Sequence, residues 1–371
     1  MTGEVLLVAG ETSGDLHAAM LAAELRALRP ELRLTGVGGA RMAEAGVDLF
    51  ERSDRLAVMG FVEVLRHVPR HLALLRRIRR RLASGTVRLV VLVDYPGFNL
   101  KVAAAAREAG VPVLYYIAPQ VWAWNEKRVQ TMARVIDRAA VILPFEQAYF
   151  AEHGVRATFV GHPLLDRASA LPERAAAREQ LGLPEEGPVL ALFPGSRAQE
   201  VERLLETFVE AARLLQARRP ALRVIVSVAP GMSVDEARCP YPLVHGASFT
   251  VLRAADAALC KSGTTTLEAA VAGCPLVVAY RTSGWSYAIA RRLVRIADIA
   301  LVNIVAGRRI VPELVQERAT PAAMAERLHP LLDPTSEERR AQVTGLAEVR
   351  AMLGEPGAAR RAAALASELI G

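Results

Sequence analysis

Short apolar runs alternate with helical patterns along most of this chain, and this alternation constrains its fold more than any other feature. Each run precedes a stretch whose apolar side chains recur every three or four residues. Strands that are apolar on both faces are typical of parallel sheets buried between crossover helices. The sequence therefore predicts an α/β fold. The expected strands cover residues 4–9, 89–93, 111–117, 139–143, 189–193, 222–228, 255–260 and 276–279.

The alternation thins at residues 163–172 and then restarts, which predicts two Rossmann-like domains. We expect an N-terminal domain over 1–165, a second domain over 166–335, and C-terminal helices over 336–371. Ligands of doubly wound sheets bind at the carboxyl ends of the strands. Two such domains facing one another would place both sets of loops in one cleft.

Net charge, cysteine content and the length of the apolar runs indicate the kinds of partner and the cellular compartment. A net charge of +7 favours anionic partners: nucleic acid, phosphorylated metabolites or an acidic lipid surface. Three cysteines without a C-x-x-C pair argue against a disulfide framework and favour a reducing cytosol. The N-terminus lacks a basic leader, and no apolar run approaches the ~18 residues of a spanning helix. We expect a soluble or peripheral protein.

Loops of the first half carry several candidate site residues. Ser13, Asp15 and His17 follow Gly10, where Ser13 could cap a helix; the segment is either a plain strand–turn–helix connection or the floor of a polar pocket. Trp122 and Trp124 stand two positions apart and could form an apolar wall for a ligand or belong to the core.

Asp94 directly follows the apolar run 89–93, so we expect it at the tip of a buried strand. Partial burial raises a carboxyl pKa, which suits a general base. The alternative is a turn or N-cap aspartate before Pro96.

Two loops of the second half resemble phosphate sites. Arg197 lies where a strand gives way to a helix, and helix starts and planar guanidinium groups both attract phosphate. The alternative is a surface arginine.

In the segment 262–268, Thr265 and Glu268 have capping-box spacing, yet the loop offers more hydroxyls than one cap needs. We expect a pyrophosphate there, with Glu268 on a ribose or on its own helix. The loop residues concerned are Ser262, Gly263, Thr264, Thr265 and Thr266.

The segment 59–82 is the largest charge anomaly, since residues 64–93 contain no acidic side chain. One interpretation is a core-packing helix with a solvated basic face. The other is a surface that dips into an anionic bilayer. Nucleic acid is less favoured, because no recognised motif accompanies the charge. The membrane-facing candidates are Phe61, Leu65, Arg66, Leu72, Arg76 and Arg77.

No Asp-x-Asp occurs, and no His, Asp or Glu cluster has metal-ligand spacing. We expect neither a metal nor a cofactor. The charge of a departing diphosphate would then fall to arginine, lysine and helix ends.

A set of ordered motifs resembles the lipid-A-disaccharide synthases, bacterial glycosyltransferases with two Rossmann-like domains (GT-B). They are residues 8–15, 57–64, 116–124, 143–146, 160–163, 194–197, 262–264 and 303 with 306–308. The resemblance implies an inverting transfer from UDP-2,3-diacylglucosamine onto 2,3-diacylglucosamine 1-phosphate. The products are a β-1,6-linked disaccharide 1-phosphate and UDP.

By the same resemblance, Asp94 is the base that takes the proton of the acceptor 6-hydroxyl. Arg197, the 262–266 loop and Asn303 hold the diphosphate, Glu268 holds the ribose, and the last helix returns to the N-terminal domain. We expect the protein at the cytoplasmic, inner leaflet of the bacterial inner membrane. The sequence leaves the oligomeric state undecided, with a homodimer as one option. The alternatives are a UDP-sugar epimerase, a GT-B transferase with a soluble acceptor, and a non-enzymatic nucleotide-sugar-binding protein of the membrane surface.

Overall fold

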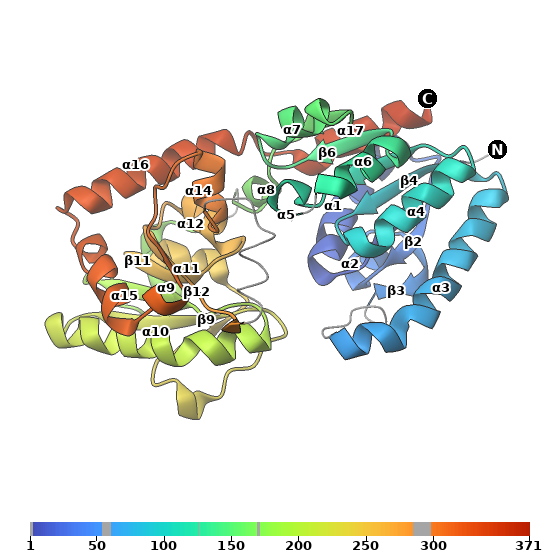
Figure 1. Cartoon of the computed structure of the whole chain (residues 1–371). Helices are drawn as coiled ribbons and strands as arrows, with labels where there is room; N and C mark the ends of the chain where they lie inside the picture. Colours follow the sequence, from blue (N-terminus) through green and yellow to red (C-terminus); the bar gives the residue numbers. More distant parts are fainter. Residues whose placement is uncertain (1–2, 54–60, 125, 169–170, 285–297) are drawn as a thin grey trace. The chain divides into compact units, whose positions relative to one another are not determined.

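The computed structural model describes residues 3–53, 61–124, 126–168, 171–284 and 298–371, with the side chains of 61–68, 124 and 126 outside the description (Figure 1). The chain forms two compact units. The first combines residues 1–163 with 355–371, and the second spans 164–354. The second unit is therefore inserted, in chain order, between the body of the first unit and its last helix.

The first unit contains a seven-stranded sheet of order β3-β2-β1-β4-β5-β6-β7, in which every pairing is parallel. After β1, the chain adds β2 and β3 on one side of the sheet. After β4, which pairs with β1, it adds β5, β6 and β7 on the other side. The strands are β1 (Glu4–Ala9), β2 (Arg33–Gly38), β3 (Asp48–Arg52), β4 (Val87–Val93), β5 (Val113–Tyr116), β6 (Arg138–Val141) and β7 (Ala157–Phe159).

Helices cover both faces of this sheet. The core on one face is shared with α3, α4 and α6, and the core on the other face is shared with α1 and α17. The helices are α1 (Thr12–Leu28), α2 (Ala40–Glu44), α3 (Phe61–Ala83), α4 (Pro96–Glu108), α5 (Val121–Trp124), α6 (Glu126–Val135), α7 (Glu146–Glu152) and α17 (Ala358–Ile370).

The second unit repeats the arrangement with six parallel strands in the order β10-β9-β8-β11-β12-β13. Helices α10 and α15 share the core on one face. The strands are β8 (Val189–Phe193), β9 (Arg223–Val228), β10 (Leu243–His245), β11 (Ala257–Lys261), β12 (Leu276–Tyr280) and β13 (Glu313–Val315). The helices are α8 (Leu164–Ala168), α9 (Arg174–Gln180), α10 (Ala198–Arg218), α11 (Ser248–Ala254), α12 (Thr265–Ala272), α14 (Leu301–Ala306), α15 (Pro321–Leu328) and α16 (Glu337–Met352), with short 3-10 turns at Glu236–Arg238, Gln316–Arg318 and Pro330–Leu332.

Local sequence signals fix several helix ends. Ser336 caps α16, where its hydroxyl accepts a hydrogen bond from the Arg339 N–H at 3.1 Å. Thr320 caps α15 in the same way, and Pro321 takes the first helical position, where no N–H is needed. Helix α12 ends at Gly273, whose φ of 72° lies in the left-handed region that favours glycine.

The two C-terminal helices belong to different units. Helix α17 packs against α1 in the first unit, as the predicted return requires. Helix α16 packs against α12 and α14 in the second unit, so the returning segment begins near 355 and not at 336. Within the described residues, no helix is long and apolar enough to cross a membrane.

Candidate active site

The first candidate site lies where the strand order of the first sheet reverses, between β1 and β4. Ala9 and Val93 are paired at the carboxyl ends of these strands, so the loops after them are neighbours. They approach so closely that a Cβ on Gly10 would lie 2.3 Å from the ring of Tyr95. Reversal points of doubly wound sheets are where ligands bind. The predicted position of Asp94 at a strand tip is confirmed.

The backbone at Asp94 is held in a strained conformation. Asp94 and Tyr95 have φ values of 49° and 51°, in the left-handed region that non-glycine residues rarely adopt. The Asp94 carbonyl accepts hydrogen bonds from Asn99 Nδ2 and Tyr115 Oη, both at 2.7 Å. Such conformations cost about 1–3 kcal/mol each and persist where the surroundings enforce them. Here Asn99 and Tyr115 hold the backbone carbonyl of Asp94 in place.

Burial raises the pKa of the Asp94 carboxyl, and the negative charge of Glu11 raises it further. A hydrogen bond from the Tyr95 backbone opposes this shift without cancelling it. A carboxylate with a raised pKa binds a proton more strongly and is a better general base. The electrostatics thus suit proton removal from a hydroxyl.

Two candidates on the first loop, Ser13 and Asp15, have structural positions that the sequence did not indicate. Helix α1 begins at Thr12 with Glu11 at the N-cap, so Ser13 lies inside the helix and the prediction that it caps is wrong. Asp15 is buried, and its carboxylate accepts hydrogen bonds from the backbone N–H groups at the start of α2. Asp15 therefore fixes α2. Its hydrogen-bond donors are Gly39, Arg41 and Met42.

His17 lies near a buried histidine that was not among the predicted site residues. Burial, and then the positive charge that His17 can carry, lowers the pKa of His162 to about 3. His162 is therefore a neutral ring at physiological pH. The only sequence signal for it was its place in the motif at 160–163.

Trp122 is anchored by a buried carboxyl group that sequence reasoning missed. Its Nε1 donates to Glu146 at 3.1 Å, and its ring lies edge-on to Phe145 at 4.9 Å. Glu146 also accepts from the N–H groups of Ile142 and Leu143. Burial raises the pKa of Glu146 to about 7, against these hydrogen bonds. The side chain of Trp124 lies outside the described residues.

The second candidate site lies at the corresponding reversal point of the other sheet, between β8 and β11. Phe193 and Cys260 are paired there, and the loops 194–197 and 262–264 follow them. Gly195 has a φ of 141°, and a Cβ on it would lie 2.6 Å from that of Glu200. Only glycine fits between this strand and α10.

Arg197 forms a cluster with Glu200 and Lys261. Glu200 accepts a hydrogen bond from the Ser196 N–H at 3.0 Å, and its other oxygen lies 2.9 Å from Lys261 Nζ and 3.4 Å from Arg197 Nη1. The Arg197 side chain is 62% exposed and so accessible to a ligand. Neither Glu200 nor Lys261 was predicted. The signal for Lys261 was one charge at the end of an apolar strand.

The hydroxyl groups of residues 262–266, called the threonine loop below, fall into two groups: those bonded within the protein and those accessible to a ligand. Ser262 donates to the Ile299 carbonyl at 2.6 Å, and Thr266 donates to the Gly263 carbonyl at 2.9 Å. Thr264 is exposed and Thr265 partly exposed, at the start of α12. The ligand-accessible hydroxyls are therefore those of Thr264 and Thr265.

The predicted capping box is wrong. Thr264, and not Thr265, is at the N-cap of α12, and its side chain accepts no capping hydrogen bond. Glu268 lies 3.3 Å from Arg167 Nη1 and also bonds Ser248. Burial raises its pKa against these two partners. Glu268 is thus held away from its own helix start.

Asn303 is buried and fully used within the protein. Its Nδ2 donates to Val311 O and Glu313 Oε1, and its Oδ1 accepts from the N–H groups of Ile310 and Val311. Two donors and two acceptors exhaust a side-chain amide. Asn303 holds the 310–313 loop and, in this structure, has no group left for a diphosphate.

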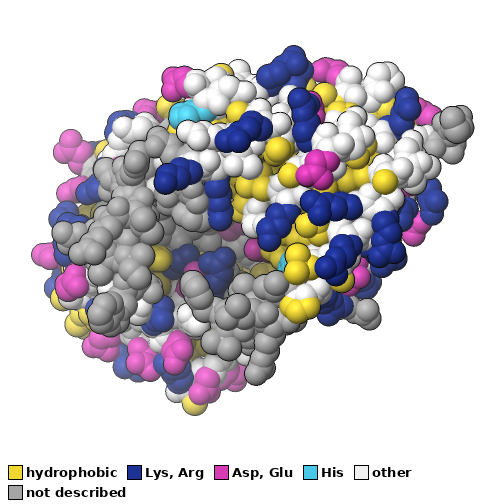
Figure 2. Space-filling view, turned by 45° about the vertical axis from the view of Figure 1, so that its right-hand side comes forward, with side chains coloured by type: hydrophobic (Ala, Val, Ile, Leu, Met, Phe, Trp, Pro, Cys, Tyr) yellow, Lys and Arg dark blue, Asp and Glu magenta, His cyan; other side chains and the backbone are white. Residues whose placement is uncertain are grey.

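Helix α3, which carries the basic segment, has a buried face and an exposed face. Leu75 and Ile78 are buried against the sheet, as in a core-packing helix. Leu72 is 43% exposed and Arg76 is exposed, whereas Arg77 bonds the Phe50 carbonyl. Figure 2 turns the side that carries α3 forward, and basic and apolar side chains lie next to one another there. The side chains of Phe61, Leu65 and Arg66 lie outside the described residues.

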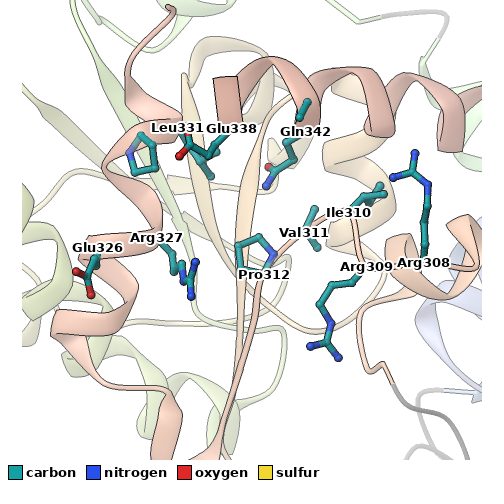
Figure 3. Close-up of a pocket in the computed structure, with 12 residues that line it drawn as sticks. Arg308, Arg309, Ile310, Val311, Pro312, Glu326, Arg327, Leu331, Glu338 and Gln342 are labelled. Carbon is teal, nitrogen blue, oxygen red and sulfur yellow. The ribbon is translucent and has the colours of Figure 1, made fainter. Parts of the chain in front are cut away.

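A separate hollow of about 700 Å³ lies among α15, α16 and the 308–312 loop (Figure 3). It lies near the amino ends of the strands, since Gln342 bonds the N–H of Leu276 at the start of β12. Two of its arginines are already paired, Arg308 with Glu348 and Arg309 with Asp298. It is lined by none of the predicted site residues. Among the described residues, no cluster of three or more His, Cys, Asp or Glu could hold a metal ion.

Comparison with known proteins adds a family to this geometry. The model of the lipid-A-disaccharide synthetase family matches residues 5–368. Lipid-A-disaccharide synthase of Anaeromyxobacter sp. (strain K) is 46% identical, over 100% of this chain and 98% of the relative. That of Myxococcus xanthus (strain DK1622) is 44% identical, over 99% and 97%.

Solved structures of low identity share the fold. The glycotransferase of kitacinnamycin superposes with a TM-score of 0.67 at 17% identity, covering 100% of this chain and 99% of its own. The calicheamicin glycosyltransferase CalG4 gives 0.64 at 18%, with the same coverage. A putative UDP-N-acetylglucosamine 2-epimerase from Listeria monocytogenes gives 0.67 at 14%, covering 97% and 94%.

Two doubly wound parallel sheets, each with polar side chains at its reversal point, have the GT-B fold. Together with the family match and the relatives, this fold defines the chain as a hexosyltransferase. The chain belongs to the lipid-A-disaccharide synthetase family. Its role is the synthesis of the lipid A disaccharide.

Proposed function

We propose that the chain transfers the sugar of UDP-2,3-diacylglucosamine to the 6-hydroxyl of 2,3-diacylglucosamine 1-phosphate, with inversion. The observation that carries this proposal is Asp94, a partly buried carboxylate with a raised pKa at the reversal point of the first sheet. In direct displacement, Asp94 takes the hydroxyl proton as that oxygen attacks the anomeric carbon. The electron pair of the breaking bond leaves with UDP.

The second unit supplies the donor site in this proposal. Arg197 and the start of α12 with Thr264 and Thr265 bind the diphosphate, because they offer accessible donors at a helix start. Glu268 accepts hydrogen bonds from the ribose hydroxyls. Its pairing with Arg167 orients that carboxylate and opposes the rise in pKa that burial causes.

Acceptor-dependent release of UDP tests this function. With UDP-2,3-diacylglucosamine, 2,3-diacylglucosamine 1-phosphate and EDTA, we expect one disaccharide 1-phosphate for each UDP released. The products are followed by mass spectrometry and a coupled UDP assay. Hydrolysis of the donor at the same rate without acceptor would contradict the proposal. Epimerisation of its sugar without acceptor would contradict it as well and would favour an epimerase.

We also propose that α3 touches the anionic surface of the inner leaflet, where acylated substrates reside. Leu72 and Arg76 are exposed on this helix, and Arg76 makes no ion pair within the described residues. Basic residues near an anionic surface contribute about 1 kcal/mol each. Contact of α3 with the membrane would bring the active site close to the acylated substrates.

Charge reversal on α3 should weaken vesicle binding. Each basic residue near the bilayer contributes about 1 kcal/mol, so Arg76→Glu should lower the partition coefficient onto phosphatidylglycerol vesicles roughly five-fold or more at low salt. Arg218→Glu, on an exposed residue near the end of α10, is the matched control and should leave the coefficient unchanged. Sedimentation with vesicles measures both. Equal losses, or none, would contradict a specific role of α3.

A further inference from the structure

We propose that Lys261 is a second cation for the donor's diphosphate, and that Glu200 positions Lys261 and Arg197 together. This inference rests on the proposed donor site in the second unit, and it adds residues to that site. Neither Lys261 nor Glu200 lies in the motifs on which the family resemblance was based. The inference depends on the contacts among three side chains from two neighbouring strand ends.

Lys261 occupies the last position of β11, directly before the threonine loop. Its Nζ lies 2.9 Å from Glu200 Oε1 and 3.8 Å from the point where a Cβ on Gly263 would stand. The face of Tyr280 lies 5.8 Å away. The ammonium group therefore lies against the loop that begins α12, on the side of the Arg197 loop.

The cluster carries more positive than negative charge. One carboxylate, Glu200, serves two cations, Lys261 and Arg197. Burial alone would raise the pKa of Glu200, but Lys261, the Ser196 N–H and the charge of Arg197 together outweigh burial and lower it. Glu200 is therefore ionised at neutral pH, and one positive charge of the cluster is left over. The Lys261 side chain is 17% exposed, and a cation in such a partly buried position favours a further anion.

Glu200 is the residue that fixes this geometry. It lies in the first turn of α10, accepts a hydrogen bond from the Ser196 N–H, and fills the space beside Gly195. Through one carboxylate it connects the loop after β8 with the end of β11. Glu200 is thus a positioning residue, because it acts on the ligand only through Lys261 and Arg197.

Two fixed cations suit a diphosphate leaving group. When the bond from the anomeric carbon to the phosphate oxygen breaks, its electron pair stays on that oxygen, and negative charge grows there. Charges that are already in place stabilise such a transition state without reorganisation. Lys261 supplies a compact ammonium and Arg197 a planar fork, so the two can bind different oxygens.

Binding of UDP and of uridine separates this role from a structural one. We expect Lys261→Met to weaken UDP binding roughly 10- to 100-fold and to leave uridine binding unchanged, because uridine has no phosphate. Lys261→Arg keeps the charge and should retain most of the UDP affinity. Calorimetry measures UDP binding, and an NMR titration measures uridine binding. Equal losses for UDP and uridine, or no loss for UDP, would overturn the inference.

Glu200→Gln tests the positioning role. The glutamine keeps the shape and loses the charge, so both cations lose their anchor. We expect a fall in kcat/KM with a urea midpoint close to that of the parent chain, and a steeper dependence of UDP affinity on salt. A lowered urea midpoint with unchanged UDP affinity would assign Glu200 to the fold alone. UDP binding needs no acceptor, so the UDP affinity, its salt dependence and the urea midpoint can be measured even if no disaccharide forms.

Discussion

Replacing Asp94 with asparagine should lower kcat by about two to four orders of magnitude and leave UDP affinity unchanged. Asparagine has the same shape and tolerates the left-handed backbone that Asp94 adopts. The backbone carbonyl keeps its bonds from Asn99 and Tyr115, so the loop should not move. What is lost is the proton acceptor. Steady-state disaccharide formation and UDP calorimetry measure the two quantities.

Glu11→Gln is the companion variant, because the charge of Glu11 helps to raise the pKa of Asp94. Without that charge the pKa of Asp94 falls, so Asp94 stays ionised to lower pH. The acidic limb of kcat/KM should therefore move to lower pH in Glu11→Gln. If Asp94→Asn kept turnover within ten-fold of the parent chain, another group would have to be the base.

Arg178→Met should destabilise the second unit by about 3–5 kcal/mol, the cost of removing one partner of a buried ion pair. Arg178 is 1% exposed and lies 2.9 Å from Asp256 Oδ2. Its other donors bond backbone carbonyls around the start of β8 and the end of α11, all of which would lose their partner. The acceptors are those of Ala254, Pro184, Glu185 and Gly187.

Arg174→Met provides the matched control, since Arg174 pairs with the same Asp256 but its side chain is 42% exposed. An ion pair of this exposure contributes at most about 1 kcal/mol. Urea denaturation followed by circular dichroism gives the free energy of unfolding of each variant. Similar losses for the two variants would show that burial of Arg178 is not what matters.

The central strands could be predicted because burial on both faces demands an unbroken apolar run. Residues 33–38, 48–52, 157–159, 243–245 and 313–315 form strands that were not predicted. Four of these are short strands near or at a sheet edge. The first, β2, is buried but contains Gly36, where a Cβ would lie 2.2 Å from the carbonyl oxygen of Leu7. The close contact with the backbone of Leu7 requires glycine at position 36, and this glycine interrupts the apolar run by which a strand is predicted.

The parts of the site that strand ends determine could also be predicted. Asp94 and Arg197 follow recognisable strands, so their place at the carboxyl edge follows from the fold. The pairing of Glu200 with Lys261 could not be predicted, because it depends on how α10 packs beside β11. Glu268 shows the converse limit. Its spacing matched a capping box, but Arg167, from a separate helix, competes for the carboxylate.

The packing of α17 has a consequence for how the protein is made. Residues 1–163 leave the ribosome first, yet the face of their sheet that α1 covers is completed only by α17, the last helix. At about 5–20 residues per second, synthesis of the second unit takes roughly ten to forty seconds. During that time the first unit has an uncovered apolar strip where Ala362, Ala363 and Ala366 will pack. Of the two units, the one that is translated earlier is thus the one completed later, and only chains that include α17 can complete it.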